Sequence, residues 1–133
     1  MFGLEKDCRY FVCQRYVRMS LGINGLYKLV MQELRMPPLS GDVFIFFGKR
    51  RQTVKLLRWD GDGFLLYQKR LECGTFELPR FDAAQKAVRM PYRTLTAIMS
   101  GVSLRSVRYR KRLWYRPSEL FCNHLTASKI NQK

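Results

Sequence analysis

The chain has 133 residues, and its 25 Lys and Arg against 10 Asp and Glu give a net charge of +15. A chain of this length fits one domain that buries about two-thirds of its unfolded surface. Its hydrophobic content of 47% excludes a disordered basic tail. The charge indicates a polyanionic partner, with nucleic acid as the first candidate and an anionic membrane surface as the second.

The positive charge is concentrated in two segments. Residues 49–71 carry seven basic and two acidic side chains, and residues 102–133 carry eight and one. The four cysteines, at positions 8, 13, 73 and 122, form no C-x-x-C pair, so a zinc site and a dense disulfide framework are both disfavoured. Reduced thiols, no apolar leader and no long apolar run together predict a cytoplasmic protein without a membrane span.

The first half of the chain predicts a strand, a helix and a second strand. The strand covers residues 9–17, and the helix covers residues 20–35, with Ser20 as its cap and Pro37-Pro38 ending it. The apolar run over residues 42–47 predicts a central strand buried on both faces. The apolar face of the helix has i, i+3/i+4 spacing and comprises Ile23, Leu26, Tyr27, Val30 and Leu34.

The second half begins with a predicted β-hairpin. Strands over residues 53–59 and 64–71 flank Asp60-Gly61-Asp62-Gly63, a structural turn whose Asp and Gly residues tolerate positive φ. Edge strands are expected over residues 75–78 and 87–90. Pro91 suits the first turn of a helix that runs to residue 100, with Gly101 as its C-cap.

Together these elements predict an α+β fold. We expect a single small domain, an antiparallel β-meander packed with one N-terminal and one C-terminal helix. This domain covers residues 1–116 and includes a basic C-terminal arm over residues 102–116. Residues 117–133 are expected to form a flexible tail.

Two basic clusters are candidate DNA-binding sites. Lys49, Arg50 and Arg51 lie at a predicted hairpin tip, where a ribbon can reach a groove and contact phosphates. The alternative is a solvated turn. Nearby strand cations that could extend the patch are Lys55, Arg58, Lys69 and Arg70. In the arm, basic residues alternate with aromatic ones, which suits phosphate contacts with stacking; the cations are Arg105, Arg108, Arg110, Lys111 and Arg112.

Other constellations favour structural or incidental interpretations. Asp60 and Asp62 lack a third nearby carboxylate for two-metal chemistry. Gly48-Lys49 follows an apolar strand and not the glycine-rich loop that nucleotide binding needs. His124 beside Cys122 lies in the predicted tail, where no packed structure would hold a catalytic base. We therefore expect no catalytic residue, metal, cofactor or small-molecule substrate. A helix-turn-helix over residues 92–112 remains an alternative to an extended arm.

Three blocks of the chain carry a family pattern. They are Met19, Gly22, Gly25 and Leu26; residues 40–41, 43–46 and 48–50; and residues 55–64 and 69–72 with Gly74, Phe76 and Pro79. The chain resembles the small accessory protein, Orf2 or TnpB, of the insertion sequence 66 family of bacterial transposable elements. The resemblance covers about residues 1–112 and implies a protein that assists a separate transposase. The family commonly has Asp-Met-Arg where this chain has Arg18-Met19-Ser20.

Three functions follow from these observations. The first is a non-catalytic accessory factor that clamps DNA between the hairpin tip and the arm. The second is an adaptor that docks a transposase through exposed aromatic residues and the helix over residues 21–35. The third is a metal-dependent nuclease or strand-transfer helper that uses Asp60 and Asp62.

Overall fold

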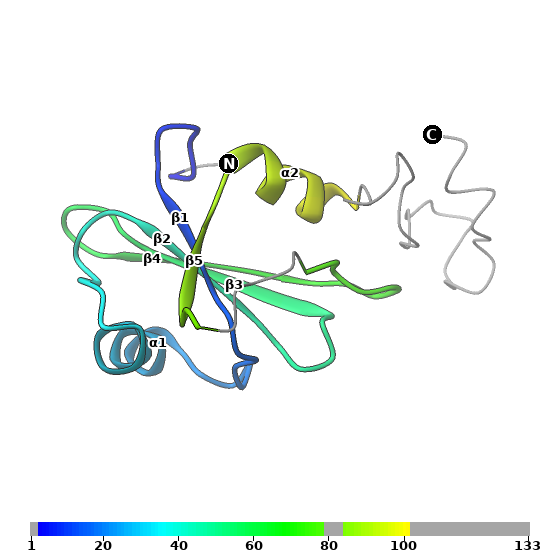
Figure 1. Ribbon diagram of the computed structural model, residues 1–133, viewed down its shortest axis with the longest axis horizontal. Helices are drawn as coiled ribbons and strands as arrows, with labels where there is room; N and C mark the ends of the chain where they lie inside the picture. The colour runs from blue at the N-terminus through cyan, green and yellow to red at the C-terminus, as the bar shows by residue number, and fades with distance from the viewer. Residues whose placement is uncertain (1–2, 79–83, 102–133) are drawn as a thin grey trace.

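The computed structural model describes residues 3–78 and 84–101, which form a five-stranded sheet with helices on its two faces (Figure 1). The fold is therefore α+β, as predicted. In chain order the elements are β1 (Tyr10–Cys13), α1 (Ile23–Leu29), η1 (Val30–Leu34), β2 (Val43–Phe47), β3 (Thr53–Trp59), β4 (Phe64–Arg70), β5 (Ala87–Met90) and α2 (Tyr92–Ser100).

The sheet is mixed, so the prediction of an antiparallel meander is wrong for its first strand. The strand order is β4-β3-β2-β1-β5, and β1 pairs in parallel with β2. The other three pairings are antiparallel. Tight turns join only β2, β3 and β4. The connection from β1 to β2 contains α1 and η1 and is long enough to return the chain for parallel pairing.

Strand β2 is buried along its whole length, as its unbroken apolar sequence predicts. Val43, Ile45 and Phe47 point into the core beneath α2, together with Leu95 and Ile98 of that helix. The alternate residues Phe44 and Phe46 point into the core beneath α1. The sheet thus has two apolar faces, each covered by one helix.

The first helix is shorter and less regular than predicted. Gly22 is its N-cap, with no side-chain hydrogen bond, so the assignment of that role to Ser20 is wrong. The helix continues as the π-helical segment η1, which ends at Arg35 in the left-handed conformation with φ 53°. Leu26 and Val30 are fully buried as predicted, but Ile23 is 36% exposed.

Among the described residues after β4 there is one strand where two were expected. Residues 75–78 form no strand, although Phe76 is fully buried against Phe47. Strand β5 and helix α2 agree with the predicted bounds, and Gly101 has the left-handed conformation of a C-cap, with φ 87°. The arm over residues 102–116 and the tail over residues 117–133 lie outside the described residues. Among the described helices, none has the length and apolarity that crossing a bilayer requires.

Candidate nucleic-acid interface

The tip between β2 and β3 is a tight turn that presents its side chains to solvent. The Gly48 amide donates to the Thr53 carbonyl at 3.1 Å, and the Arg51 amide donates to the Gly48 carbonyl at 2.9 Å. Arg51 closes the turn with φ 56°. The side chains of Lys49, Arg50 and Arg51 are all exposed. Local backbone bonds therefore position these cations.

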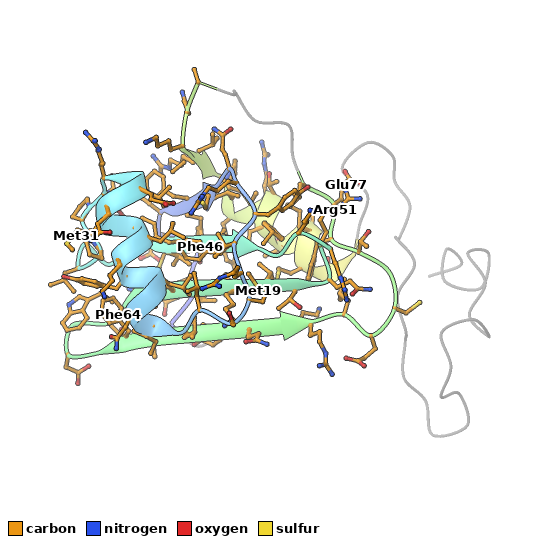
Figure 2. The ribbon with its side chains drawn as sticks, turned by 90° about the horizontal axis from the view of Figure 1, so that it is seen from below. Met19, Met31, Phe46, Arg51, Phe64 and Glu77 are labelled. Atoms are coloured by element: carbon orange, nitrogen blue, oxygen red, sulfur yellow. The ribbon has the colours of Figure 1, made fainter. Side chains whose placement is uncertain are left out.

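Two flanking segments support the tip. On one side the Phe76 amide donates to the Arg51 carbonyl at 2.7 Å. On the other side the chain after β1 crosses the tip, where the Val17 amide donates to the Phe47 carbonyl at 2.9 Å. Met19 lies so close to Gly48 that a Cβ added to Gly48 would be 2.9 Å from the Met19 Cγ. Figure 2 views the sheet from the side of α1 and labels Met19 and Arg51.

A hollow of about 490 Å³ lies where the second of these segments meets the tip. We call it the basic groove. Its four cations come from three separate parts of the chain: Arg18, Lys49 with Arg50, and Arg70. None of the described residues that line it is acidic. Its remaining lining residues are Tyr16, Val17, Met19, Gly48, Gln52 and Thr53.

The groove joins positive charge with an exposed aromatic ring. Tyr16 is 49% exposed, which leaves a ring face available for stacking. Arg70 is partly neutralised by Glu72, since its Nε lies 3.0 Å from the Glu72 Oε2. Both of those side chains are well exposed, so the ion pair is weak and can exchange for a phosphate.

The other predicted strand cations do not join the groove. Lys55 is only 5% exposed, and its Nζ donates to the Leu21 carbonyl at 2.7 Å. Lys55 is therefore unavailable for phosphate contact, contrary to the prediction from the sequence. Arg58 donates to the carbonyls of Gly3 and Gly41, which ties the N-terminal segment to the sheet.

Lys69 and Arg70 point to opposite faces of the sheet, because side chains alternate along a strand. The Lys69 Nζ donates to the Met99 carbonyl at 2.9 Å, near the C-terminal end of α2, where the helix dipole favours a cation. Of the strand cations named in the sequence analysis, the groove therefore contains only Arg70. The arm cations Arg105, Arg108, Arg110, Lys111 and Arg112 lie outside the described residues.

The Asp-Gly sequence joins β3 to β4 in a four-residue turn. Trp59 pairs with Phe64, and the Asp60 amide donates to the Gly63 carbonyl at 2.7 Å. Gly61 has φ 85°, whereas Gly63 has no positive φ. The Asp60 Oδ1 lies 3.8 Å from the Arg58 Nη1, and the Asp62 side chain is exposed. Among the described residues no group of three or more His, Cys, Asp and Glu could hold a metal ion.

Two other surface hollows contain acidic residues, which makes them poorer sites for an anion. One lies beside Cys13 and includes Glu33, which forms an ion pair with Arg15. Burial raises the pKa of the Cys13 thiol, so this thiol is a poor nucleophile at neutral pH. The other hollow includes Glu5, Asp7 and Asp42.

Among the groove residues that could contact DNA, sequence analysis missed Tyr16 and Arg18. Both follow β1 in the chain, 30 or more residues before the hairpin tip. The parallel pairing of β1 with β2 brings them together, since it places the end of β1 beside the end of β2. The sequence does predict the strand over residues 9–17 that leads to these residues. Rules for hairpins, however, do not identify which strand pairs with it.

The match to a family agrees with the residue blocks described above. The family described as IS66 Orf2 like protein matches residues 8–109, and the chain belongs to this family. Membership indicates an accessory role in the transposition of insertion sequence 66 elements.

Two relatives come from Sinorhizobium fredii (strain NBRC 101917 / NGR234), and both are named as uncharacterized. Protein y4jC is 38% identical over 79 residues, covering 59% of this chain and 68% of the relative. Protein y4hO is 28% identical over 105 residues, covering 79% and 90% respectively. No solved structure matches the chain significantly.

Proposed function

We propose that this protein is a non-catalytic transposition accessory factor that binds DNA through the basic groove. The observation that supports this function is the convergence of Arg18, Lys49, Arg50 and Arg70 on one hollow that no acidic residue of the described chain lines. Backbone phosphates are the ligands that such a cluster favours, because each neutralised phosphate releases condensed counterions. The exposed Tyr16 ring adds a surface on which a base or sugar can lie.

The proposed DNA-binding set differs from the one predicted from sequence. It keeps Lys49, Arg50 and Arg70, adds Arg18 and omits Lys55, Arg58 and Lys69. Arg51 belongs to the same exposed tip but does not line the groove. The basic arm over residues 102–116 remains a proposed second contact, and the triple variant Arg110→Ala/Lys111→Ala/Arg112→Ala in the full chain tests it separately.

The function can be tested by measuring the affinity of the protein for labelled duplex DNA across a salt series. Both an element-end sequence and a scrambled sequence are needed. The variant Lys49→Ala/Arg50→Ala should weaken binding to both sequences. If each cation contacts one phosphate, the slope of log K against log salt should decrease by about 1.8, at about 0.9 for each contact.

The matched control is Lys86→Ala/Arg89→Ala. These side chains are also one lysine and one arginine, both exposed, and they lie in or beside β5 at the opposite edge of the sheet. Their loss should leave the slope nearly unchanged. Equal losses of affinity in the two variants would show that the groove contributes only through the overall positive charge of the protein. No binding by the wild-type protein near physiological salt would reject the proposed function.

A second candidate function, docking of a transposase, is favoured by apolar exposure on the first helix. Ile23 is 36% exposed and Met31 is 44% exposed, one on α1 and one on η1. Between them Tyr27 packs edge-on against Phe64, with ring centroids 5.8 Å apart. Under this function, Ile23→Ser/Met31→Ser should abolish capture of the element's transposase while DNA affinity stays unchanged.

A further inference from the structure

Strand β4 forms one margin of the sheet and has an outer edge that no described strand covers. It is seven residues long, while β5 at the opposite margin has four. Its first four side chains, Phe64, Leu65, Leu66 and Tyr67, are apolar and only half-buried. In Figure 2, β4 runs along the margin of the sheet, and α1 crosses the near face beside Phe64. A long, partly apolar edge of this kind is a template for a further strand.

The pairing with β3 determines which backbone groups of β4 point outward. Gly63 and Leu71 both bond to the side of β3, through the Asp60 amide to Gly63 carbonyl bond and the Leu71 amide to Gln52 carbonyl bond. Because bonding alternates along an antiparallel strand, the even-numbered residues direct their amides and carbonyls away from β3. These residues are Phe64, Leu66, Gln68 and Arg70.

The charges along this edge are arranged asymmetrically. Asp60 and Asp62 precede the strand, and Lys69 and Arg70 end it. Antiparallel pairing of two identical strands brings the start of one copy beside the end of the other. We propose that β4 pairs with β4 of a second copy of this chain, in the antiparallel direction, to give a continuous sheet across a two-fold dimer.

Charge selects the register of this pairing. When Leu66 faces Leu66 of the second copy, Phe64 faces Gln68, and Arg70 lies beside the turn that carries Asp62, so opposite charges approach each other. When Tyr67 lies on the two-fold axis, Arg70 faces Phe64, and the turn that carries Asp62 lies beside Glu72, which brings two negative charges near each other. Both registers place outward-directed backbone groups opposite one another, so the charges decide between them.

The dimer has a consequence for the basic groove, although it does not depend on DNA binding. Residues opposite each other in an antiparallel pair point to the same face of the sheet. Arg70 lies on the α1 face together with the rest of the groove, since its neighbour Lys69 contacts α2 on the other face. The two grooves of the dimer therefore open on the same side of the joined sheet.

The first test measures the molar mass of the full chain by light scattering and sedimentation equilibrium, over micromolar to tens of micromolar protein. We expect a concentration-dependent dimer. Gln68→Pro removes one outward-directed amide without removing a bond to β3, because proline is tolerated at such edge positions. This variant should be monomeric with an unchanged circular dichroism spectrum. A wild-type monomer throughout, or a folded Gln68→Pro dimer, would overturn the proposal.

A cross-linking test reports the register and does not depend on the folding of the proline variant. Leu66→Cys places two thiols at a hydrogen-bonded pair on the two-fold axis, where Cα atoms lie about 5.5 Å apart, within disulfide range. Mild oxidation should link Leu66→Cys into a covalent dimer. Tyr67→Cys and the wild-type chain, with its native cysteines, are the matched controls and should remain uncross-linked.

The charges provide an independent check of the same register. Arg70→Asp should shift the equilibrium to monomer, and Asp62→Arg/Arg70→Asp should restore the dimer, because the opposite charges then meet in exchanged positions. Failure of the double variant to recover, or cross-linking of Tyr67→Cys in preference to Leu66→Cys, would contradict the register. A strand of the transposase that pairs with β4 while the protein alone stays monomeric would replace the second copy as its partner.

Discussion

The Nζ atom of Lys55 donates a 2.7 Å hydrogen bond to the carbonyl of Leu21, across 34 positions in the sequence. Lys55 lies on the inner strand β3, and Leu21 precedes α1. The bond therefore attaches the loop that leads into the first helix to the middle of the sheet. The same loop carries Arg18 and Met19 of the basic groove. Lys55 therefore stabilises the loop that carries part of the basic groove and does not line the groove itself.

Replacing Lys55 by Met should destabilise the protein without changing the salt dependence of DNA binding. Methionine is also unbranched and is one atom shorter than lysine, so the substitution keeps most of the packing but leaves the Leu21 carbonyl without its charged donor, at a cost of about 1–3 kcal/mol. Urea unfolding measures this loss. The control Lys49→Met should retain stability and lower the salt slope by about 0.9. The reverse result, a lower slope for Lys55→Met alone, would place Lys55 at the DNA surface.

The two glycines of the Asp-Gly turn should respond differently to alanine. Gly61 has φ 85°, so Gly61→Ala should cost about 1–2 kcal/mol of stability. Gly63 has no positive φ and no atom within 4 Å of an added Cβ, so Gly63→Ala should be nearly neutral. Thermal unfolding of the two variants provides the comparison. Equal costs would contradict the backbone conformations of this turn.

Gly48 is required by the approach of Met19. A Cβ at position 48 would lie 2.9 Å from the Met19 Cγ, so Gly48→Ala should destabilise the protein by about 1–3 kcal/mol through overpacking. Met19→Ala in the same chain should recover much of this loss by opening space. A double-mutant cycle measured by denaturant unfolding tests the coupling. Additive costs would show that the two residues do not touch.

Two arginines in the left-handed conformation offer stabilising substitutions. Arg51 has φ 56° and Arg35 has φ 53°, which glycine adopts with less strain. Arg51→Gly and Arg35→Gly should each raise the free energy of unfolding by about 1 kcal/mol. Arg50→Gly is the control, because Arg50 has no positive φ and glycine there should give no gain. Calorimetry of the three variants would disprove the strain if all of them lost stability.

The half-buried ion pair of Arg9 and Asp42 should stabilise the start of β2. Arg9 donates to both Asp42 oxygens at 2.9 Å, and Ser40 donates to one of them at 3.0 Å. The Asp42 side chain is only 7% exposed, so Asp42→Asn should cost about 1–3 kcal/mol. Asp62→Asn, at an exposed turn position, should cost little. Similar midpoints for the two variants in urea would contradict this difference.

Elements determined by local patterns were readable from the sequence. The apolar run of β2, the Asp-Gly turn between β3 and β4 and the Gly101 cap of α2 depend on neighbouring residues alone, and each is present close to its predicted bounds. The family blocks are likewise a property of the sequence. The length of α1 was less predictable, because its π-helical end and its Gly22 cap depend on packing against the sheet.

Only the tertiary structure decided the partner of β1 and the residues of the basic groove. Parallel pairing through a helical connection depends on contacts between distant residues, for which no local periodicity exists. That pairing placed Tyr16 and Arg18 beside the hairpin tip, while the alternation of β3 directed Lys55 into the core. The sequence by itself determined that this protein is a folded domain with a large positive charge. The packing of the strands and helices determined which of the charged side chains are exposed, because the burial of a side chain depends on what its strand lies against.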